Sequence, residues 1–312
     1  MLRSGMAMVL SQRLQTLGAE IYKQRMRYLF LLPALTVFTL FKFYPMYRAI
    51  VFSVSKYSFA GIKFVGLTHY QRLLTDPDFG RALLNTFELA LLSIVMGFWT
   101  PILLALLLHE VAFKNAFRTV YYIPHLFSWV VIGGIWLWLL SPNGLINSAL
   151  GLVGIKGVYW LTSAFWIKPV LVVMGIWHGV GYSALLYLAS LQSIDPQIYE
   201  AAKIDGATKL QQAMRITLPL ITPTVVVVFI LNMIKNLQSF DQIYIMSGGG
   251  SGGLGGEVKR ASDVVMTYAY DKGIGLGRLD YASAISLVLF VIILILTLAN
   301  MKMTKYDEGR RF

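Results

Sequence analysis

The sequence predicts an all-α polytopic membrane protein with six transmembrane helices. Of its 312 residues, 57% are hydrophobic and 13% are charged, whereas soluble domains carry about 25% charged residues. Four long stretches contain no Asp, Glu, Lys or Arg: residues 89–108, 169–194, 216–234 and 281–301. Each is near or above the ~18–20 residues that cross a bilayer as a helix. Lipid offers the backbone no hydrogen-bond partner, so such segments must be helices.

We expect six spans, at residues 28–52, 84–108, 119–140, 169–193, 221–246 and 281–302. The first span is the least regular, because its apolar pattern continues past Lys42 and Pro45, as in a kinked helix. An even number of spans puts both termini on one side of the membrane. We therefore expect a membrane-spanning domain at 28–302, preceded by the tail 1–27 and followed by the tail 303–312.

The distribution of Lys and Arg predicts the orientation of the spans. The tails and loops on the side of the termini carry 14 of these residues, against 10 on the other side. Lys23, Arg25 and Arg27 directly precede the first span, and Lys302 and Lys305 directly follow the last. Such short flanks count most in the positive-inside rule. We therefore expect both termini to be cytoplasmic.

The segment before the first span has an amphipathic pattern. Leu10, Leu14, Leu17 and Ile21 recur at helical spacing among polar residues. This spacing predicts a helix lying on the inner leaflet, and a frayed polar tail is an equally good interpretation. Charges recur through residues 13–27, so the segment does not read as a cleavable signal peptide.

Composition argues against several other classes of function. The net charge is +12, but the basic residues lie beside apolar spans and not on a recognition helix, so a nucleic-acid partner is not expected. The chain has no cysteine, and its four histidines are scattered without ligand spacing, so no metal site is expected. The glycine-rich stretch 247–256 lacks the Gly-Lys-Ser/Thr of a phosphate-binding loop, and we interpret it as a linker.

The loop 194–220, between the fourth and fifth spans, has the most specific pattern in the chain. Residues 200–220 read EAAKIDGATKLQQAMRITLPL. Asp195 and Pro196 favour a helix start, and Gly206 interrupts that helix and permits a sharp turn. A second helical segment follows and is expected to close at Pro219, before the next span. A helix–glycine–helix element with one apolar side suits docking into a groove of a soluble partner.

This pattern resembles the EAA loop of permease subunits of ATP-binding-cassette importers. The resemblance rests on Glu200, Ala201, Ala202, Asp205, Gly206, Ala207, Ile216, Leu218 and Pro219. In that family the loop is the coupling helix and lies in a cleft of the cytoplasmic ATPase. Leu210 and Met214 would supply the apolar side of this contact. The sequence departs from the pattern at Ala213, where relatives often carry an aromatic residue.

Three further segments resemble permeases of carbohydrate importers: residues 64–86, 122–147 and 239–250. The second of these is similar to the subgroup that handles complex oligosaccharides and polysaccharide fragments, alginate-type uronate chains among them. The resemblance, which is to maltose-type permeases, implies the type I importer permease fold. It also implies a multi-pass protein of the bacterial inner membrane that carries sugar and has no ATPase site of its own.

The same resemblance implies the partners. A second homologous permease would complete the pathway, two ATP-binding subunits would dock on the cytoplasmic side, and an extracytoplasmic solute-binding protein would deliver the sugar. ATP and Mg would be used by the partner ATPase, so no cofactor is expected on this chain.

Polar residues in the fifth span suggest where the solute passes. Asn232, Lys235, Asn236 and Ser239 follow the i, i+3, i+4, i+7 spacing of one helix face. Amides are costly in lipid, so this face should meet protein or a wet cavity. By resemblance, Asn232, Asn236 and Ser239 stand where maltose-type permeases contact sugar. In the fourth span the same comparison selects His178, Gly179 and Tyr182.

Structural interpretations of these residues remain open. Asn and Ser also form hydrogen bonds between neighbouring helices, and the Gly175–Gly179 pair favours close helix packing. Around the third span and the loop after it lies an aromatic group that an interfacial belt explains better than a sugar platform. It comprises Trp136, Trp138, Tyr159, Trp160 and Trp166.

Lys235 is the most informative single charge. A lysine within a span should pair with an acid or line an aqueous path. The nearby acids in the sequence are Asp241 and Glu88. An anionic substrate is the third alternative, and it underlies the narrower hypothesis of an acidic, uronate- or alginate-like oligosaccharide.

Two rival functions fit the sequence less well. A secondary transporter would need intramembrane acids as relays, yet Glu88 and Asp241 both stand at span edges. An intramembrane enzyme would need a catalytic motif, and none is found. The sequence therefore predicts the membrane subunit that forms half of the pathway of an oligosaccharide importer, coupled to a separate ATPase.

Overall fold

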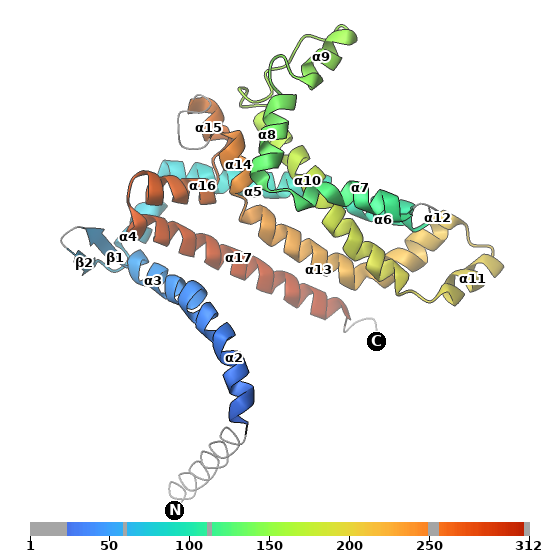
Figure 1. Cartoon of the computed structure of the whole chain (residues 1–312), viewed down its shortest axis with the longest axis horizontal. Coiled ribbons are helices and arrows are strands. Elements are labelled where there is room, and N and C mark those ends of the chain that lie inside the picture. Colours follow the sequence, from blue (N-terminus) through green and yellow to red (C-terminus); the bar gives the residue numbers. More distant parts are fainter. Residues whose placement is uncertain (1–23, 59–60, 111–113, 249–255, 309–312) are drawn as a thin grey trace, which may run out of the picture.

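The computed structural model describes residues 24–58, 61–110, 114–248 and 256–308. The predicted amphipathic pattern at Leu10, Leu14, Leu17 and Ile21 lies outside these residues, as does most of the glycine-rich stretch. The described chain is almost entirely helical (Figure 1), apart from one hairpin of strands β1 (Ser55–Ser58) and β2 (Gly61–Phe64). Among these described residues, five helices are long and apolar enough to cross a membrane, or six if one bent pair is counted as a span. The predicted fold class is confirmed.

The first span is the outlying one. It consists of α2 (Arg25–Phe38), a π-helical turn η1 (Thr39–Phe43) and α3 (Tyr44–Ser53). Pro45 stands at the start of α3, where a residue without an N–H group is tolerated. α3 packs along α17 (Leu279–Glu308), whereas α2 extends away from the bundle (Figure 1). None of the apolar window of this span is buried within the chain, so lipid or another chain must cover it.

The second span begins earlier than predicted. Helices α5 (Pro77–Gly97) and α6 (Trp99–Glu110) form one span from Pro77 to Leu108. Asp76 caps α5, because its carboxylate accepts hydrogen bonds from the backbone N–H groups of Asp78 and Phe79. The cap and the proline at the first helical position fix the start of α5.

The predicted continuous third span is wrong. α7 (Lys114–Leu126) and α8 (Trp129–Leu139) meet at an angle of 101°. Pro124 removes a donor from the last turn of α7, and Ser128 is extended. Close packing of α7 against α10 (Ile167–Gln192) accompanies the bend: a Cβ at Gly181 would overlap with the carbonyl oxygen of Tyr121. The loop after α8 carries the short helix α9 (Leu145–Leu152).

The fourth and sixth spans lie close to their predicted positions, but the fifth differs at both ends. The fourth is α10, and the sixth is the Leu279–Lys302 part of α17. The fifth is continuous from α12 (Lys209–Gln212) through a π-helical turn η2 (Ala213–Thr217) into α13 (Leu218–Leu237).

Two expectations for this fifth span are therefore wrong. Pro219 does not close the preceding helix, because the π-helical turn places it in the first turn of α13. The span also ends at Leu237, and the short helix α14 (Asp241–Met246) follows the break. Ser239 thus lies in the break and does not continue the helical face.

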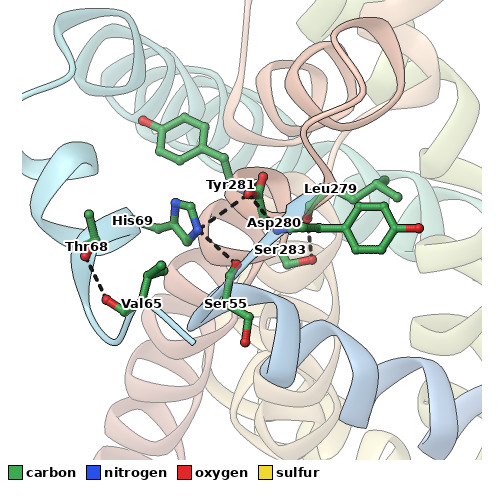
Figure 2. A network of polar contacts seen from close by, with 9 residues as sticks. Ser55, Val65, Thr68, His69, Leu279, Asp280, Tyr281 and Ser283 are labelled. Atoms are coloured by element: carbon green, nitrogen blue, oxygen red, sulfur yellow. Dashed lines mark hydrogen bonds and ion pairs between the residues drawn. The ribbon is translucent and has the colours of Figure 1, made fainter. Parts of the chain in front are cut away.

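A polar network ties the hairpin to the sixth span; we call it the hairpin clamp (Ser55, His69, Asp76, Tyr268, Asp280 and Tyr281). Figure 2 shows His69 of α4 (Thr68–Leu74) between Ser55 and Asp280. His69 Nε2 lies 3.1 Å from the Ser55 carbonyl oxygen and 3.7 Å from Asp280 Oδ2. The hydroxyl groups of Tyr268 and Tyr281 donate to Asp76 Oδ2 at 2.6 and 2.7 Å. The clamp joins the starts of the second and sixth spans.

Candidate functional site

A polar cavity lies among the helices and has a volume of about 390 Å³. We call it the first cavity. Its wall comes from α5, α6, α10 and α13, from the segment 238–242 after the helix break, and from Trp129 of α8. Aromatic faces are contributed by Phe98, Trp129, Phe229 and Phe240. Polar groups on an apolar and aromatic wall are the usual composition of a small-molecule site.

Five of the predicted pathway residues line this cavity: Gly179, Asn232, Lys235, Asn236 and Ser239. His178 and Tyr182 do not belong to its wall. Gln238, Asp241 and Gln242 also line it. None of the three was predicted as a pathway residue, and Asp241 was considered only as an acidic partner of Lys235. On a continued helix Gln238 and Asp241 would point away from the face of Asn232 and Lys235, so the break at Gln238 brings them to the wall. Gln242 stands seven residues after Lys235, and the spacing of that face could have selected it.

Asn232 and Asn236 differ in their hydrogen bonding. Asn232 Nδ2 donates to Ser183 Oγ of α10 at 3.2 Å. This is a hydrogen bond between neighbouring helices, as in the structural interpretation of these polar residues. Asn236 is half-buried and forms no side-chain hydrogen bond with any residue that the structure describes. The amide of Asn236 is therefore open to a solute, whereas that of Asn232 is already engaged.

Lys235 is exposed to the first cavity and pairs with no acid among the residues that the structure describes. Glu88, one of the two acids considered from the sequence, forms a salt bridge with Lys168 instead. Asp241 lines the same cavity but makes no salt bridge with Lys235. Glu88 is therefore not the partner of Lys235, which lines the cavity without a salt bridge to any residue that the structure describes.

His178 supports the cavity wall from behind. Its buried ring stacks on Trp129 with ring centroids 4.0 Å apart, and it lies 5.2 Å from the ring of His125. Tyr182 stacks on His125, with ring centroids 5.0 Å apart. This row of rings fills the bend between α7 and α8, so His178 and Tyr182 position Trp129 and the bend.

The Gly175–Gly179 pair does not pack two spans together in the described chain. A Cβ at Gly179 would meet nothing within 4 Å, and one at Gly175 would lie 3.4 Å from the Gln242 side chain. Both glycines line the first cavity. Gly181, by contrast, lies where α10 approaches the backbone of α7 closely, and this glycine was not predicted.

The sugar-platform interpretation of the aromatic group also finds no support. None of Trp136, Trp138, Tyr159, Trp160 and Trp166 lines the first cavity. Trp160 donates to Asn147 Oδ1 at 3.0 Å and makes an edge contact with Trp166, so this pair organises the loop around α9. Trp138 and Tyr159 are exposed.

The loop 194–220 forms the predicted helix–glycine–helix element, which we call the coupling element. α11 (Pro196–Ile204) is capped by Asp195, whose carboxylate accepts from the Gln197 N–H at 2.9 Å. Gly206 has a φ of 76°, a left-handed conformation that glycine adopts without strain. Thr208 then starts α12 with a reciprocal capping box to Gln211.

The two helices of the coupling element leave apolar side chains in the open. Ile204, Leu210 and Met214 are 87%, 73% and 58% exposed. Glu200, Ala201 and Asp205 are exposed beside them, whereas Ala202 is buried against the rest of the element. Ile204 was missed in the sequence because it stands directly before the expected turn. Exposed apolar residues rimmed by charges are typical of a contact surface for another protein.

A bundle of membrane spans around a polar cavity, with a helical loop that exposes apolar residues at one end, defines a transport subunit that needs partners. The family described as the inner membrane component of binding-protein-dependent transport systems matches residues 91–302. The chain belongs to this family, and the predicted membership of the importer permeases is confirmed. It is an inner-membrane permease of a system that depends on a binding protein.

Its relatives are permeases of sugar importers. The chain is 36% identical to the polygalacturonan/rhamnogalacturonan transport system permease protein YteP of Bacillus subtilis, covering 93% of this chain and 91% of that protein. It is 30% identical to the arabinooligosaccharides transport system permease protein AraP of the same organism, covering 92% and 91%.

A solved structure has the same fold. A chain of a bacterial transporter involved in the import of the acidic polysaccharide alginate superposes with a TM-score of 0.83 at 32% identity. The match covers 93% of this chain and 98% of that chain. The predicted type I importer permease fold is thereby confirmed.

Proposed function

We propose that this chain forms half of the pathway by which an ATP-driven importer takes up an acidic, uronate-containing oligosaccharide. The observation that carries the proposal is Lys235, a cation without an acidic partner in the described wall of the first cavity. Carboxylates form charge-assisted hydrogen bonds with such a group. Asn236, Gln238 and Gln242 add amides for hydroxyl groups, and Trp129 adds an aromatic face.

The relatives support an acidic sugar without requiring it. Polygalacturonan is the transported class named for YteP, and alginate is that named for the transporter of known structure. AraP is named for arabinooligosaccharides, and Asp241 brings an acid into the same cavity. A neutral oligosaccharide is therefore the second candidate substrate.

A charge-neutralised variant separates the two candidates. In Lys235→Met we expect uptake of oligogalacturonate by the reconstituted complex to fall about tenfold or more, because a bond to a charged group is lost. Uptake of the methyl-esterified oligomer, which has the same length and no charge, should change much less. Lys235→Arg is the matched control and should retain preference for the acid. Equal losses for both sugars would leave a neutral substrate as the better proposal.

The coupling element is proposed as the docking site of a separate ATPase. Ile204, Leu210 and Met214 would enter a groove of that subunit, with Glu200 and Asp205 at the rim. Two such subunits would use ATP and Mg, and this chain would bind no cofactor. Docking on a cytoplasmic subunit makes the loop cytoplasmic, and six spans then put both termini on that side.

A backbone variant tests the docking and with it the orientation. Gly206→Pro should abolish co-purification of the ATPase and reduce transport more than tenfold, because proline cannot adopt the φ of 76°. Gly206→Asn is the matched control, since asparagine tolerates the left-handed region, and it should retain the ATPase. Full ATPase binding by the proline variant would refute the docking role of this turn.

The remaining partners are also proposed. A second, homologous permease would complete the pathway, and the exposed α2–α3 span offers it an apolar surface. An extracytoplasmic solute-binding protein would deliver the sugar to the side opposite the coupling element.

A further inference from the structure

A second, larger cavity of about 880 Å³ lies beside the hairpin clamp. It is lined by the start of α5 and by α15 (Gly256–Ser262), α16 (Val265–Tyr270) and the π-helical turn η3 (Asp271–Gly275). These elements connect the fifth and sixth spans or begin the second. They therefore lie on the side opposite the coupling element, which is extracytoplasmic in the proposed orientation. Pockets of this volume hold ligands of several rings.

The second cavity contains more cations than its acids neutralise. Four basic side chains line it: Arg81, Lys259, Arg260 and Lys272. Lys259 pairs with Asp271 at 2.6 Å, and Arg81 pairs with Asp78 at 3.5 Å. The third acid, Asp263, accepts a hydrogen bond from the hydroxyl of Thr267, and burial raises the pKa of its carboxyl group.

Two cations in this cavity therefore remain available to a ligand. Within the part of the chain that the structure describes, Arg260 and Lys272 form no salt bridge. Lys272 Nζ lies 4.8 Å from the centre of the Tyr268 ring, which holds it at the cavity wall. A guanidinium and an ammonium in one cavity suit a ligand with more than one carboxylate.

Three aromatic rings separate the two cavities. Phe240 lines the first cavity, whereas Tyr244 and Tyr270 line the second. The ring centroids of Phe240 and Tyr244 are 5.1 Å apart, and those of Tyr244 and Tyr270 are 5.0 Å apart. Phe240 belongs to the segment that follows the helix break at Gln238. The three rings therefore form one contact cluster between residues that line the first cavity and residues that line the second.

We propose that the second cavity is an extracytoplasmic binding site for the acidic oligosaccharide, in which Arg260 and Lys272 bind carboxylates and Tyr244 and Tyr270 face sugar rings. This proposal rests on the proposed function, because the ligand of the second cavity is the acidic sugar assigned to the first. A long oligosaccharide engages both cavities at once, so its second contact is intramolecular and strengthens binding. A disaccharide engages one cavity at a time and gains no such advantage.

The test compares chain lengths in the complete transporter with its binding protein in proteoliposomes. The double variant Arg260→Gln/Lys272→Gln should raise the KM for pentagalacturonate about threefold to tenfold, as expected for two partly exposed charge pairs. The KM for digalacturonate should change less than twofold, and kcat should be retained for both. The matched control is Lys63→Gln/Lys156→Gln, which removes two exposed cations outside both cavities and should leave both KM values unchanged.

Each alternative result identifies what has failed. An equal rise in KM for pentagalacturonate and digalacturonate would overturn the second site. So would an equal rise in KM in the control variant, because the cause would then be a general charge effect. If the double variant bound the binding protein more weakly but kept the wild-type ratio of the two KM values, Arg260 and Lys272 would contact that protein. This result would also overturn the second site. Arg260→Lys/Lys272→Arg keeps both charges and should restore wild-type values, which excludes misfolding as the cause. A wild-type complex that imports only esterified oligomers would refute the proposed function itself.

Discussion

The hairpin clamp and the first cavity are built from the same kinds of polar residues, but they differ in where those residues find partners. In the clamp, Asp76 accepts four hydrogen bonds from its own chain, and His69 and Asp280 are buried together. In the cavity, Lys235 has no acidic partner, and Asn236 has no side-chain hydrogen bond, among the residues that the structure describes. Satisfied polar groups stabilise a fold, whereas unsatisfied ones at a cavity wall are free for a solute.

This difference predicts that variants in the two regions affect different measurements. Changes in the clamp should lower the stability of the complex and leave transport per folded complex near normal. Changes in the first cavity should lower transport per folded complex and leave the stability of the complex near normal. A variant that affects both quantities equally would show that the distinction between the regions does not hold at that residue.

The largest effect is expected at Asp76. Asp76→Ala removes two bonds from tyrosine hydroxyls and the cap of α5, and should lower the free energy of unfolding by about 3 kcal/mol. Thermal unfolding of the purified complex measures this loss. Normal transport per folded complex is expected, and a selective loss of transport would move Asp76 from the clamp to the pathway.

The contribution of Asp76 should also depend on pH. Burial raises the pKa of this carboxyl group, but the hydrogen bonds from Tyr268, Tyr281 and the α5 backbone outweigh burial, so its pKa lies below the usual value. A carboxylate with a lowered folded-state pKa stabilises the fold above its unfolded-state pKa and loses this effect as pH falls through the folded-state value. The stability difference between wild type and Asp76→Ala should be constant from neutral pH to about pH 5 and should shrink below about pH 4.

The intermediate effect is expected at Asn236. Asn236→Leu removes a donor and an acceptor from the cavity while keeping the number of side-chain heavy atoms and the branching at Cγ. It should lower uptake of the native sugar about tenfold. Stability should be nearly unchanged, because no bond within the described chain is lost. Asn232→Leu is the matched comparison, and should lower stability as well, since Asn232 donates to Ser183. Equal destabilisation by both variants would mean that Asn236 is a structural residue.

The sequence was informative where the signal was local. Long apolar windows predicted the spans, and the Glu-Ala-Ala-Gly pattern predicted the turn at Gly206. Asp76 and Pro77 predict a helix start in the same way as Asp195 and Pro196, which were interpreted correctly. The first pair was not used to place the start of the second span. Hydropathy averages over a window, so it could not reveal the bend after Pro124 or the break at Gln238.

The parts that could not be predicted depend on residues distant in the sequence. The clamp joins Asp76 to Tyr281, which is 205 residues away. The missed cavity residue Gln238 was assigned to a continuing helix, on which it would point away from the Lys235 face, and the break places it at the wall. The role of His178 behind Trp129 depends on the bend between α7 and α8. Such contacts follow from tertiary packing and leave no periodic signal.

The smallest effect is expected at Tyr70, at the edge of the clamp. Its hydroxyl donates to Ser53 Oγ at 2.8 Å, and Ser53 Oγ in turn donates to the Ile50 carbonyl oxygen at 2.7 Å. Tyr70→Phe keeps the ring and leaves the Ser53 hydroxyl its own acceptor, so the loss should be about 1 kcal/mol or less. Tyr281→Phe is the matched change and should cost more, because its hydroxyl bonds the charged Asp76. Thermal unfolding of the two variants measures the difference, and transport should remain normal in both. A larger loss at Tyr70 than at Tyr281 would show that the hydrogen bond from Tyr70 to Ser53, and not the bond to the carboxylate of Asp76, contributes more to the stability of the clamp.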